Sequence, residues 1–346
     1  MFDLLPIGEN PIKEKKLSLE DIEKYRVRHT DEVPKPDVVL SIGGQIVSTR
    51  KNIFGISGKA KVGKSFLMTL INSIVLKKGE MGVLESYLPK GKDKILYFDT
   101  EQSLYHVSLM LNRVKKIVEE RKMDNLLMYA FDSLRTDDRY EYVKFLINNI
   151  EGVGLVIIDG VADLVKSVND EVMAVDLADT LRRLATERDV AIGYVLHQNP
   201  SDNVKMRGHL GTVLMNKSET VIQISTSKED ESVKLVDTLQ TRNKKPENWS
   251  FEIIDGQPVI MDEVFEEKPK GRIKVKQLTD DERKNILAVI YSDVRKDLGL
   301  GYTVLVEKVR EVHGNLGVTS AKEMVKYCKE MGWIANDGSR SNYFLI

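Results

Sequence analysis

Short apolar runs alternate with longer amphipathic stretches through the middle of the chain. Five runs are rich in β-branched and aromatic side chains, at 53–56, 95–98, 126–129, 155–158 and 191–196. Several of them are apolar on both faces, which is typical of central strands in a parallel sheet covered by helices. Helical periodicity lies between them at 66–76, 104–120 and 172–188. This alternation predicts an α/β fold with a mainly parallel sheet and crossover helices.

The runs on either side of this region predict antiparallel strands. Residues 38–42 and 45–48 flank Gly43-Gly44, a pair that favours the two-residue primed turn of a β-hairpin. Three later runs follow one another without long helices between them, at 221–224, 233–239 and 249–253. We therefore expect the sheet to end in antiparallel strands.

Changes in composition divide the chain into four parts. In a polar N-terminal segment, Ser18 is placed to cap one short helix, and Pro34 and Pro36 indicate a linker. A second, charged linker follows the α/β region. We place the parts at 1–36 (polar segment and linker), 37–263 (α/β domain), 264–276 (charged linker) and 277–346 (C-terminal domain).

The C-terminal part has a different periodicity from the α/β region. It contains helical stretches at 280–294, 302–312 and 320–331, and then two short apolar runs at 333–335 and 343–346 around a turn. Three helices followed by a short hairpin is the order of a winged-helix domain.

Composition limits the classes of protein that the chain can belong to. Its 346 residues carry 52 Lys and Arg against 53 Asp and Glu, so any nucleic-acid site has to be a local patch. The single cysteine, Cys328, excludes an internal disulfide. No apolar run approaches the roughly 20 residues of a membrane helix, and the first residues lack the features of a signal peptide. We expect a cytoplasmic protein without membrane contact.

One motif has a direct chemical meaning, because residues 58–65 fit G-x-x-x-x-G-K-[ST] in full. The N–H groups of such a loop surround a phosphate chain, and the helix that follows presents its positive end to the same anion. Lys64 would reach the β- and γ-phosphates, and the Ser65 hydroxyl would bind Mg²⁺. The predicted ATP-binding residues are Gly58, Lys59, Ala60, Lys61, Val62, Gly63, Lys64 and Ser65.

Two further lysines lie inside this loop. Lys59 stands where the deviant phosphate loops of the ParA and MinD type carry an extra lysine, but those loops continue with two glycines. Here Ala60 and Lys61 follow, which counts against that class. Solvent exposure of the two lysines is the simpler interpretation.

Acidic residues follow two of the predicted strands. Asp159 ends the apolar run at 155–158, in the form of a Walker B motif, and is a second candidate for the Mg²⁺ shell. Many phosphate-loop enzymes place a catalytic Glu directly after this Asp, but here the residue is Gly160. The run at 95–98 offers Asp99 and Glu101 at its end instead, and the carboxyl ends of parallel strands face the same crevice. One of these carboxylates could therefore activate water. For Glu101 the alternative is a structural role as a carboxylate at a helix start.

A Glu at this strand end, within F-D-T-E at 98–101, resembles the RecA-like ATPases, which include recombinases, DnaB-type helicases and KaiC. The resemblance covers about 38–254 and implies a RecA-like core with Glu101 as catalytic base. It also implies a γ-phosphate sensor at the end of the run at 191–196, for which Gln198 and His197 are the candidates and Asn199 a lesser one.

The polar segment at 203–212 is expected to be a flexible loop. It contains R-G-H-L-G at 207–211 and resembles the second DNA-facing loop of RepA-type hexameric helicases of plasmids and mobile elements. This resemblance implies that Lys205 and Arg207 meet the phosphates of single-stranded DNA. Contact of Arg207 with nucleotide and simple solvent exposure are the alternatives. The loop after Asp159, with Lys166 as its cation, would be the first such loop.

DnaB-like proteins carry a K-x-R finger after a late strand, which reaches the ATP of the neighbouring subunit. Here Gln240 takes the first position, so Arg242 alone matches, with Lys244 and Lys245 as substitutes. An arginine supplied in trans makes hydrolysis depend on assembly. The resemblance thus implies a homo-hexamer or another homo-oligomer.

Lysines also gather on the last predicted helix. Lys322, Lys326 and Lys329 share one face, and Met324, Val325, Cys328 and Met331 supply the apolar side. In a winged helix this face could enter the major groove of duplex DNA, with Ser339, Arg340 and Ser341 in the wing. A protein-interaction role is the alternative, and Trp333 and Tyr343 are expected in the core.

These observations predict an ATP- and Mg²⁺-dependent hydrolase acting on DNA, resembling RepA- and DnaB-type helicases or related replication and mobilisation ATPases. The alternative is a nucleotide-switched DNA-binding regulator that does not separate strands. A signalling ATPase resembling KaiC is a third interpretation, and it would show no dependence on DNA.

Overall fold

The computed structural model describes residues 18–23, 25–120, 123–199, 206–262, 278–292, 294, 298–313, 316–336 and 342–346. The predicted charged linker at 264–276 therefore lies outside the described residues, as does Lys205. The same holds for Ser339, Arg340 and Ser341.

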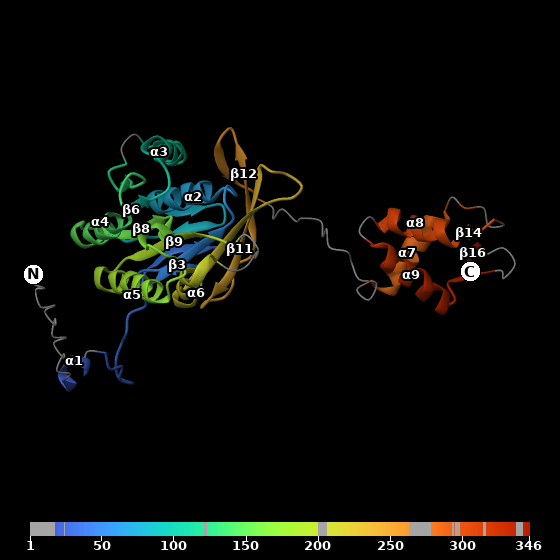
Figure 1. The fold of residues 1–346 in the computed structure, drawn as a ribbon, viewed down its shortest axis with the longest axis horizontal. Coiled ribbons are helices and arrows are strands. Elements are labelled where there is room, and N and C mark those ends of the chain that lie inside the picture. The colour runs from blue at the N-terminus through green and yellow to red at the C-terminus, as the bar shows by residue number, and fades with distance from the viewer. Residues whose placement is uncertain are drawn as a thin grey trace, which may run out of the picture.

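A nine-stranded mixed sheet forms the centre of the α/β region (Figure 1). Its order is β13-β12-β11-β10-β3-β9-β8-β6-β7, and the strands from β10 to β7 are parallel. All five predicted strands are confirmed, and one of them, at 126–129, forms the edge of the sheet. The parallel strands are β3 (Ile53–Gly58), β6 (Lys94–Asp99), β7 (Leu126–Ala130), β8 (Val153–Asp159), β9 (Ala191–His197) and β10 (Thr220–Thr226).

Antiparallel strands complete the sheet, as expected, but they begin one strand later than the sequence suggested. The run at 221–224 belongs to β10, which is parallel to β3. A helix that the sequence pattern did not reveal, α6 (Gly208–Lys217), provides the crossover that this direction requires. The antiparallel strands are β11 (Val233–Thr241), β12 (Trp249–Ile254) and β13 (Gln257–Ile260).

Helices cover both faces of the sheet, because its central strands are apolar on both sides. Along β6, Ile95 and Tyr97 join one core cluster, whereas Leu96 and Phe98 join the other. Figure 1 shows α2 and α3 over the first face and α5 and α6 over the second. The helices are α2 (Lys64–Lys77), α3 (Leu104–Val118), α4 (Thr136–Asn149), the 3-10 helix η1 (Val161–Leu164) and α5 (Glu171–Arg188).

The predicted N-terminal hairpin is present, but it is part of a separate four-stranded sheet. Gly43 and Gly44 have φ angles of 53° and 72°, as a primed turn requires. The short helix α1 (Leu19–Glu23) begins where Ser18 accepts a hydrogen bond from the Asp21 N–H at 3.2 Å. The small sheet contains β1 (Val38–Ile42), β2 (Gln45–Thr49), β4 (Gly79–Met81) and β5 (Leu84–Ser86), of which β4 and β5 were not expected.

The C-terminal residues contain three helices and a hairpin in the expected order, together with a short strand, β14, that was not expected. A capping box of Thr279 and Glu282 starts the first helix, and Leu305, Met324 and Cys328 are buried in a cluster of their own. The elements are α7 (Asp280–Tyr291), β14 (Leu300–Gly301), α8 (Tyr302–His313), α9 (Val318–Glu330), β15 (Ile334–Asn336) and β16 (Asn342–Leu345).

Two details of this region test the sequence analysis. Trp333 and Tyr343 pack against the apolar cluster, as expected. Met331 was expected on the apolar side but is 47% exposed, because α9 ends at Glu330 and the chain turns away from the core there. None of the helices that the structure describes has the length and apolar character needed to cross a membrane.

Candidate nucleotide site

The phosphate-loop motif lies between β3 and α2, where the chain turns over the carboxyl end of the sheet. A Cβ atom on Gly58 would lie 2.8 Å from the Ile224 carbonyl oxygen, so β10 leaves no room for a side chain. Gly63 precedes α2 with φ 98°, a conformation that favours glycine. Lys61 also has a positive φ, 62°, which an L-residue adopts at a cost. Both motif glycines therefore have a structural reason.

Lys64 is 9% exposed and its ammonium lies inside the loop. The Nζ atom donates to the carbonyl oxygens of Gly58 at 3.2 Å and Lys59 at 2.8 Å, and it lies 3.0 Å from His197 Nδ1. Burial lowers the pKa of Lys64, against the opposing influence of Asp159 and Glu101. A buried cation in a loop of this geometry is suited to an anionic ligand.

Glu101 lies beside this lysine, with His197 between them. The His197 Nε2 atom is 3.3 Å from Glu101 Oε1 and 3.4 Å from Oε2. Because an ammonium can only donate, His197 Nδ1 accepts from Lys64 and its Nε2–H donates to Glu101. The hydrogen bond from His197 lowers the pKa of Glu101. The tertiary structure thus joins three sequence-predicted residues in one hydrogen-bonded chain.

Two buried carboxylates lie beneath Glu101. Asp159 ends β8, is 8% exposed and accepts a hydrogen bond from Tyr97 Oη at 2.7 Å. Asp99 ends β6 and accepts from the backbone N–H groups of Glu101 at 3.0 Å and Gln102 at 2.7 Å. Burial raises the pKa of both carboxyls, that of Asp99 to about 7. Asp99 therefore fixes the turn that carries Glu101, whereas the sequence had indicated no role for Tyr97.

Gly160 explains why no acidic residue follows Asp159. Its φ is 91°, and a Cβ atom there would lie 2.2 Å from Thr100 Oγ1 and 3.0 Å from Glu101 Cγ. The Thr100 hydroxyl, and next to it the side chain of Glu101, occupy the space that a side chain at position 160 would need. Glycine is therefore favoured at position 160 both by its positive φ and by the close approach of the turn after β6.

Gln198 is 6% exposed and also lies at this edge of the sheet. Its backbone N–H donates to the Gly58 carbonyl oxygen at 3.3 Å, so the residue after His197 is held against the phosphate loop. Of these two candidate residues, His197 supplies the side chain that bridges Lys64 and Glu101.

The predicted R-G-H-L-G loop is largely helical. Gly208 and Gly211 lie in α6, and Arg207 is exposed directly before it. A Cβ atom on Gly208 would lie 2.6 Å from the Val168 carbonyl oxygen, and one on Gly211 would lie 2.5 Å from Met206 Cβ. Gly208 also has a φ of 71°, so it serves both backbone conformation and close packing. Of the flexible loop expected at 203–212, residues 208–212 are helical and residues 203–205 lie outside the described residues. Arg207 stays near the site, because its backbone N–H donates to the His197 carbonyl oxygen at 3.0 Å.

Arg242 is not gathered with the other predicted residues. It follows β11, which runs antiparallel to β10, so it lies at the amino edge of the parallel strands, opposite the phosphate loop. The side chain is exposed, and its Nη2 donates to the Lys217 carbonyl oxygen at 3.3 Å. Gln240 donates to the Met215 carbonyl oxygen, and Lys245 pairs with Asp237 at 2.9 Å. Arg242 can meet a phosphate loop only on another copy of the chain.

The lysines of α9 are at the surface, as expected. Lys322 and Lys326 are exposed, and Lys326 Nζ is 3.8 Å from Glu330 Oε1. The Lys329 ammonium lies over the ring of Tyr343, 5.8 Å from its centroid. Lys322 therefore leaves its charge available to a partner, since it has no partner among the described residues.

The residues present fit a magnesium nucleotide. The Ser65 hydroxyl has no hydrogen-bond partner in the described part of the chain, and the Asp159 carboxylate is close by through the same strand edge. Within that part, no group of three or more His, Cys, Asp or Glu side chains could hold a metal ion. Mg²⁺ would accordingly be held by phosphate oxygens, Ser65 and water, with Asp159 behind the water.

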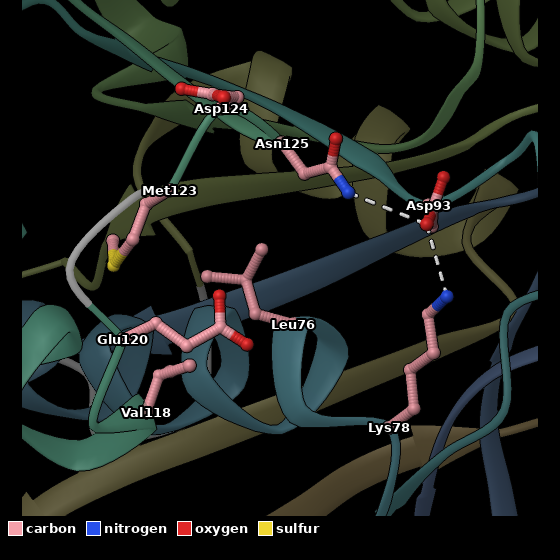
Figure 2. Close-up of a pocket in the computed structure, with 8 residues that line it drawn as sticks. All are labelled: Leu76, Lys78, Asp93, Val118, Glu120, Met123, Asp124 and Asn125. Atoms are coloured by element: carbon pink, nitrogen blue, oxygen red, sulfur yellow. Dashed lines mark hydrogen bonds and ion pairs between the residues drawn. The ribbon is translucent and has the colours of Figure 1, made fainter.

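A separate cavity lies at the opposite edge of the sheet (Figure 2). It has a volume of about 400 Å³ and lies where α2 and α3 end and β6 and β7 begin. Figure 2 shows Lys78 and Asn125 pointing toward Asp93, which accepts from them at 3.0 and 3.3 Å. Lys78, Asp93 and Asn125 are thus paired with one another, and the cavity does not belong to the nucleotide site, because it lies at the amino ends of β6 and β7.

Known proteins resemble this chain in structure rather than in sequence. No protein-family model matches the chain, and no curated protein matches it either. Among solved structures, a KaiC-like protein, PH0186, from the hyperthermophilic archaeon Pyrococcus horikoshii OT3 is similar with a TM-score of 0.44 and 14% sequence identity. The match covers 62% of this chain and 90% of that chain. The α/β assignment rests on the strand order and direction of the chain itself.

His197→Ala should shift the acid limb of the pH–rate profile for nucleotide hydrolysis to higher pH. The hydrogen bond from His197 is the largest cause of the lowered pKa of Glu101, so its loss lets that pKa rise toward its ordinary value. Glu101 then becomes protonated, and inactive as a base, at a higher pH than in the wild type. The limb is measured from initial rates between about pH 4 and 8.

His106→Ala is the matched control, because His106 is exposed on α3 and contacts Ser103 rather than Glu101. An acid limb at the same pH in His197→Ala and in the wild type would contradict the assigned contact.

Proposed function

We propose that the chain is an ATPase in which Glu101 activates the attacking water. The observation that carries this proposal is the chain of hydrogen bonds from Lys64 through His197 to Glu101 at the mouth of the phosphate loop. It brings a phosphate-binding lysine and a carboxylate of lowered pKa to the same place. The resemblance of F-D-T-E to RecA-like ATPases supports the same assignment.

Each residue has a defined part in this mechanism. Lys64 exchanges its contact with His197 for the phosphate oxygens, and the loop N–H groups hold the rest of the chain. Glu101 accepts a proton from the attacking water, and the water oxygen bonds to the γ-phosphorus. The bond between the γ-phosphorus and the β-γ bridging oxygen breaks at the same time, which yields ADP and phosphate. Bound Mg²⁺ supplies positive charge to the phosphates. His197 keeps Glu101 in place through their hydrogen bond, and it loses its own contact with Lys64 when Lys64 moves to the phosphates.

Lys64→Ala should abolish nucleotide binding or turnover, because it removes the only cation buried inside the loop. Glu101→Gln should keep ATP binding and lower kcat by about 100-fold or more, since general-base catalysis contributes about 10²–10⁴. Phosphate release and calorimetric ATP binding measure the two effects separately.

Glu85→Gln is the matched control for the carboxylate, because Glu85 lies on the small sheet and accepts from the Gly44 N–H. Normal turnover in Lys64→Ala would remove the phosphate-loop assignment, and normal turnover in Glu101→Gln would remove the base.

We propose that ATP binds between copies of the chain in a homo-oligomer, with Arg242 as the finger. Its place at the edge opposite the phosphate loop supports this arrangement, because a ring of copies brings the amino edge of one to the carboxyl edge of the next. Among the residues that the structure describes, the exposed guanidinium contacts one backbone carbonyl, that of Lys217. Lys244 and Lys245 follow on the same segment and extend its positive charge.

Arg242→Ala should lower kcat by about 10³-fold in the assembled protein and leave ATP affinity within a few-fold, because a trans arginine acts on the transition state. Mixing it with Lys64→Ala should restore part of the activity, since a mixed interface pairs an intact loop with an intact finger. Turnover is measured against protein concentration, with mass determined in parallel. Loss of activity in a species shown to be monomeric would refute the trans role.

We propose that the substrate of the motor is DNA, as in the RepA- and DnaB-type helicases and mobilisation ATPases that the sequence resembles. Lys205 and Arg207 would contact the backbone of single-stranded DNA. The hydrogen bond from the Arg207 backbone N–H to the His197 carbonyl oxygen supports coupling between DNA contact at Arg207 and the ATP site. Lys322 and Lys326 would let a winged helix reach duplex DNA as well.

Single-stranded DNA should raise the ATPase rate, and Arg207→Ala should weaken DNA binding and reduce the dependence on salt by about one ion. Lys116→Ala is the control, because Lys116 is exposed on α3, on the other face of the sheet from α6. Equal salt dependence in Arg207→Ala and wild type would contradict the contact.

The alternative function is a nucleotide-switched regulator that binds duplex DNA through α9. The exposed lysine face of that helix favours it. Duplex binding controlled by ATP, with no strand separation and slow hydrolysis, would establish this function in place of the motor.

A further inference from the structure

A second lysine lies against the phosphate loop, on a strand for which the sequence indicated no chemistry. Lys234 is near the start of β11, opposite Thr226 of β10, and is 6% exposed. A Cβ atom on Gly63 would lie 3.3 Å from both Cδ and Cε of Lys234. The aliphatic part of the Lys234 side chain therefore packs against Gly63, the glycine directly before α2.

The hydrogen-bond partners of the Lys234 ammonium among the described residues are neutral groups. It donates to Thr226 Oγ1 at 3.1 Å and to the Glu231 carbonyl oxygen at 2.6 Å. These two contacts use two of its three N–H groups, and the third has no acceptor among the described residues. No carboxylate oxygen of those residues lies within ion-pair distance. Burial lowers the pKa of Lys234, with Glu231 and Asp230 acting in the opposite direction from further away.

A buried cation without an ion-pair partner is costly, because the interior does not replace the water it loses. Val236, two residues further along the same face of β11, belongs to the apolar cluster beneath α2, so an aliphatic side chain could pack there. A charge in this position needs a partner that the described residues do not provide. The adjoining loop binds an anion in the function proposed above.

We infer that Lys234 is a second lysine of the nucleotide site and that its remaining N–H donates to the phosphate chain from the β11 side. This inference rests on the proposed ATP binding and extends it. Lys64 meets the phosphates from the β9 side, where His197 lies, and Lys234 meets them across Gly63. Bound phosphate supplies a negative charge to the Lys234 ammonium, which makes no ion pair with the described residues.

The test compares Lys234→Met, Lys234→Arg and Lys228→Met by calorimetric titration with ATP and ADP and by thermal melting without nucleotide. Methionine keeps most of the stem beside Gly63 and removes the charge. Lys228 is exposed on the same turn, so Lys228→Met removes one charge without touching the loop. We expect Lys234→Met to weaken both nucleotides at least tenfold, Lys234→Arg to recover most of the affinity, and Lys228→Met to stay within twofold.

The melting temperature separates a binding role from a structural one. Because an unpaired buried charge is removed, nucleotide-free Lys234→Met should melt at or above the wild-type temperature while it binds ATP more weakly. Unchanged affinity in Lys234→Met would overturn the inference. Weaker binding accompanied by a lower melting temperature would also overturn it, since the lysine would then act only on the fold. A wild-type chain that binds no ATP would instead remove the proposed function.

Discussion

The parallel register of four adjacent strands is the constraint on which the candidate site depends. The strand order β3-β9-β8-β6 brings the phosphate loop, His197, Asp159 and the Glu101 turn to one edge. Gly58 is opposite His197 in one pair, and Asp99 is opposite Asp159 in another. A slip of one residue would turn each of these side chains to the other face of the sheet. Function therefore depends on the same backbone pairing that buries the apolar faces.

Charged side chains buried at this edge of the sheet determine which ligand the site can bind. Lys64 and Lys234 are buried cations that make no ion pair with the described residues, and Asp159 and Asp99 are buried carboxylates with raised pKa. A magnesium nucleotide carries both signs of charge and can compensate both groups. In the proposed function, relief of these unfavourable buried charges would contribute to the free energy of nucleotide binding.

Close packing determines which residues can take part. Thr100 and Glu101 lie so close to position 160 that glycine is needed there, and the close contacts of Gly208 and Gly211 let α6 pack tightly. The expected flexible loop at 203–212 is helical from Gly208 onward, and residues 203–205 lie outside the described residues. A glycine in a sequence indicates either conformational freedom or close approach, and only the neighbouring segment decides between them.

The sequence by itself determined the central strands, the phosphate loop and the identity of Lys64, Glu101 and Asp159 as candidates. These features are local, because strand periodicity and the loop motif are both written in consecutive residues. The tertiary structure alone decided that His197 bridges Lys64 and Glu101, that Arg242 lies at the opposite edge, and that Lys234 touches Gly63. Each of these contacts or positions involves segments that are far apart in the chain. Strand order and direction bring such segments together, and neither segment carries a local sequence pattern that records it.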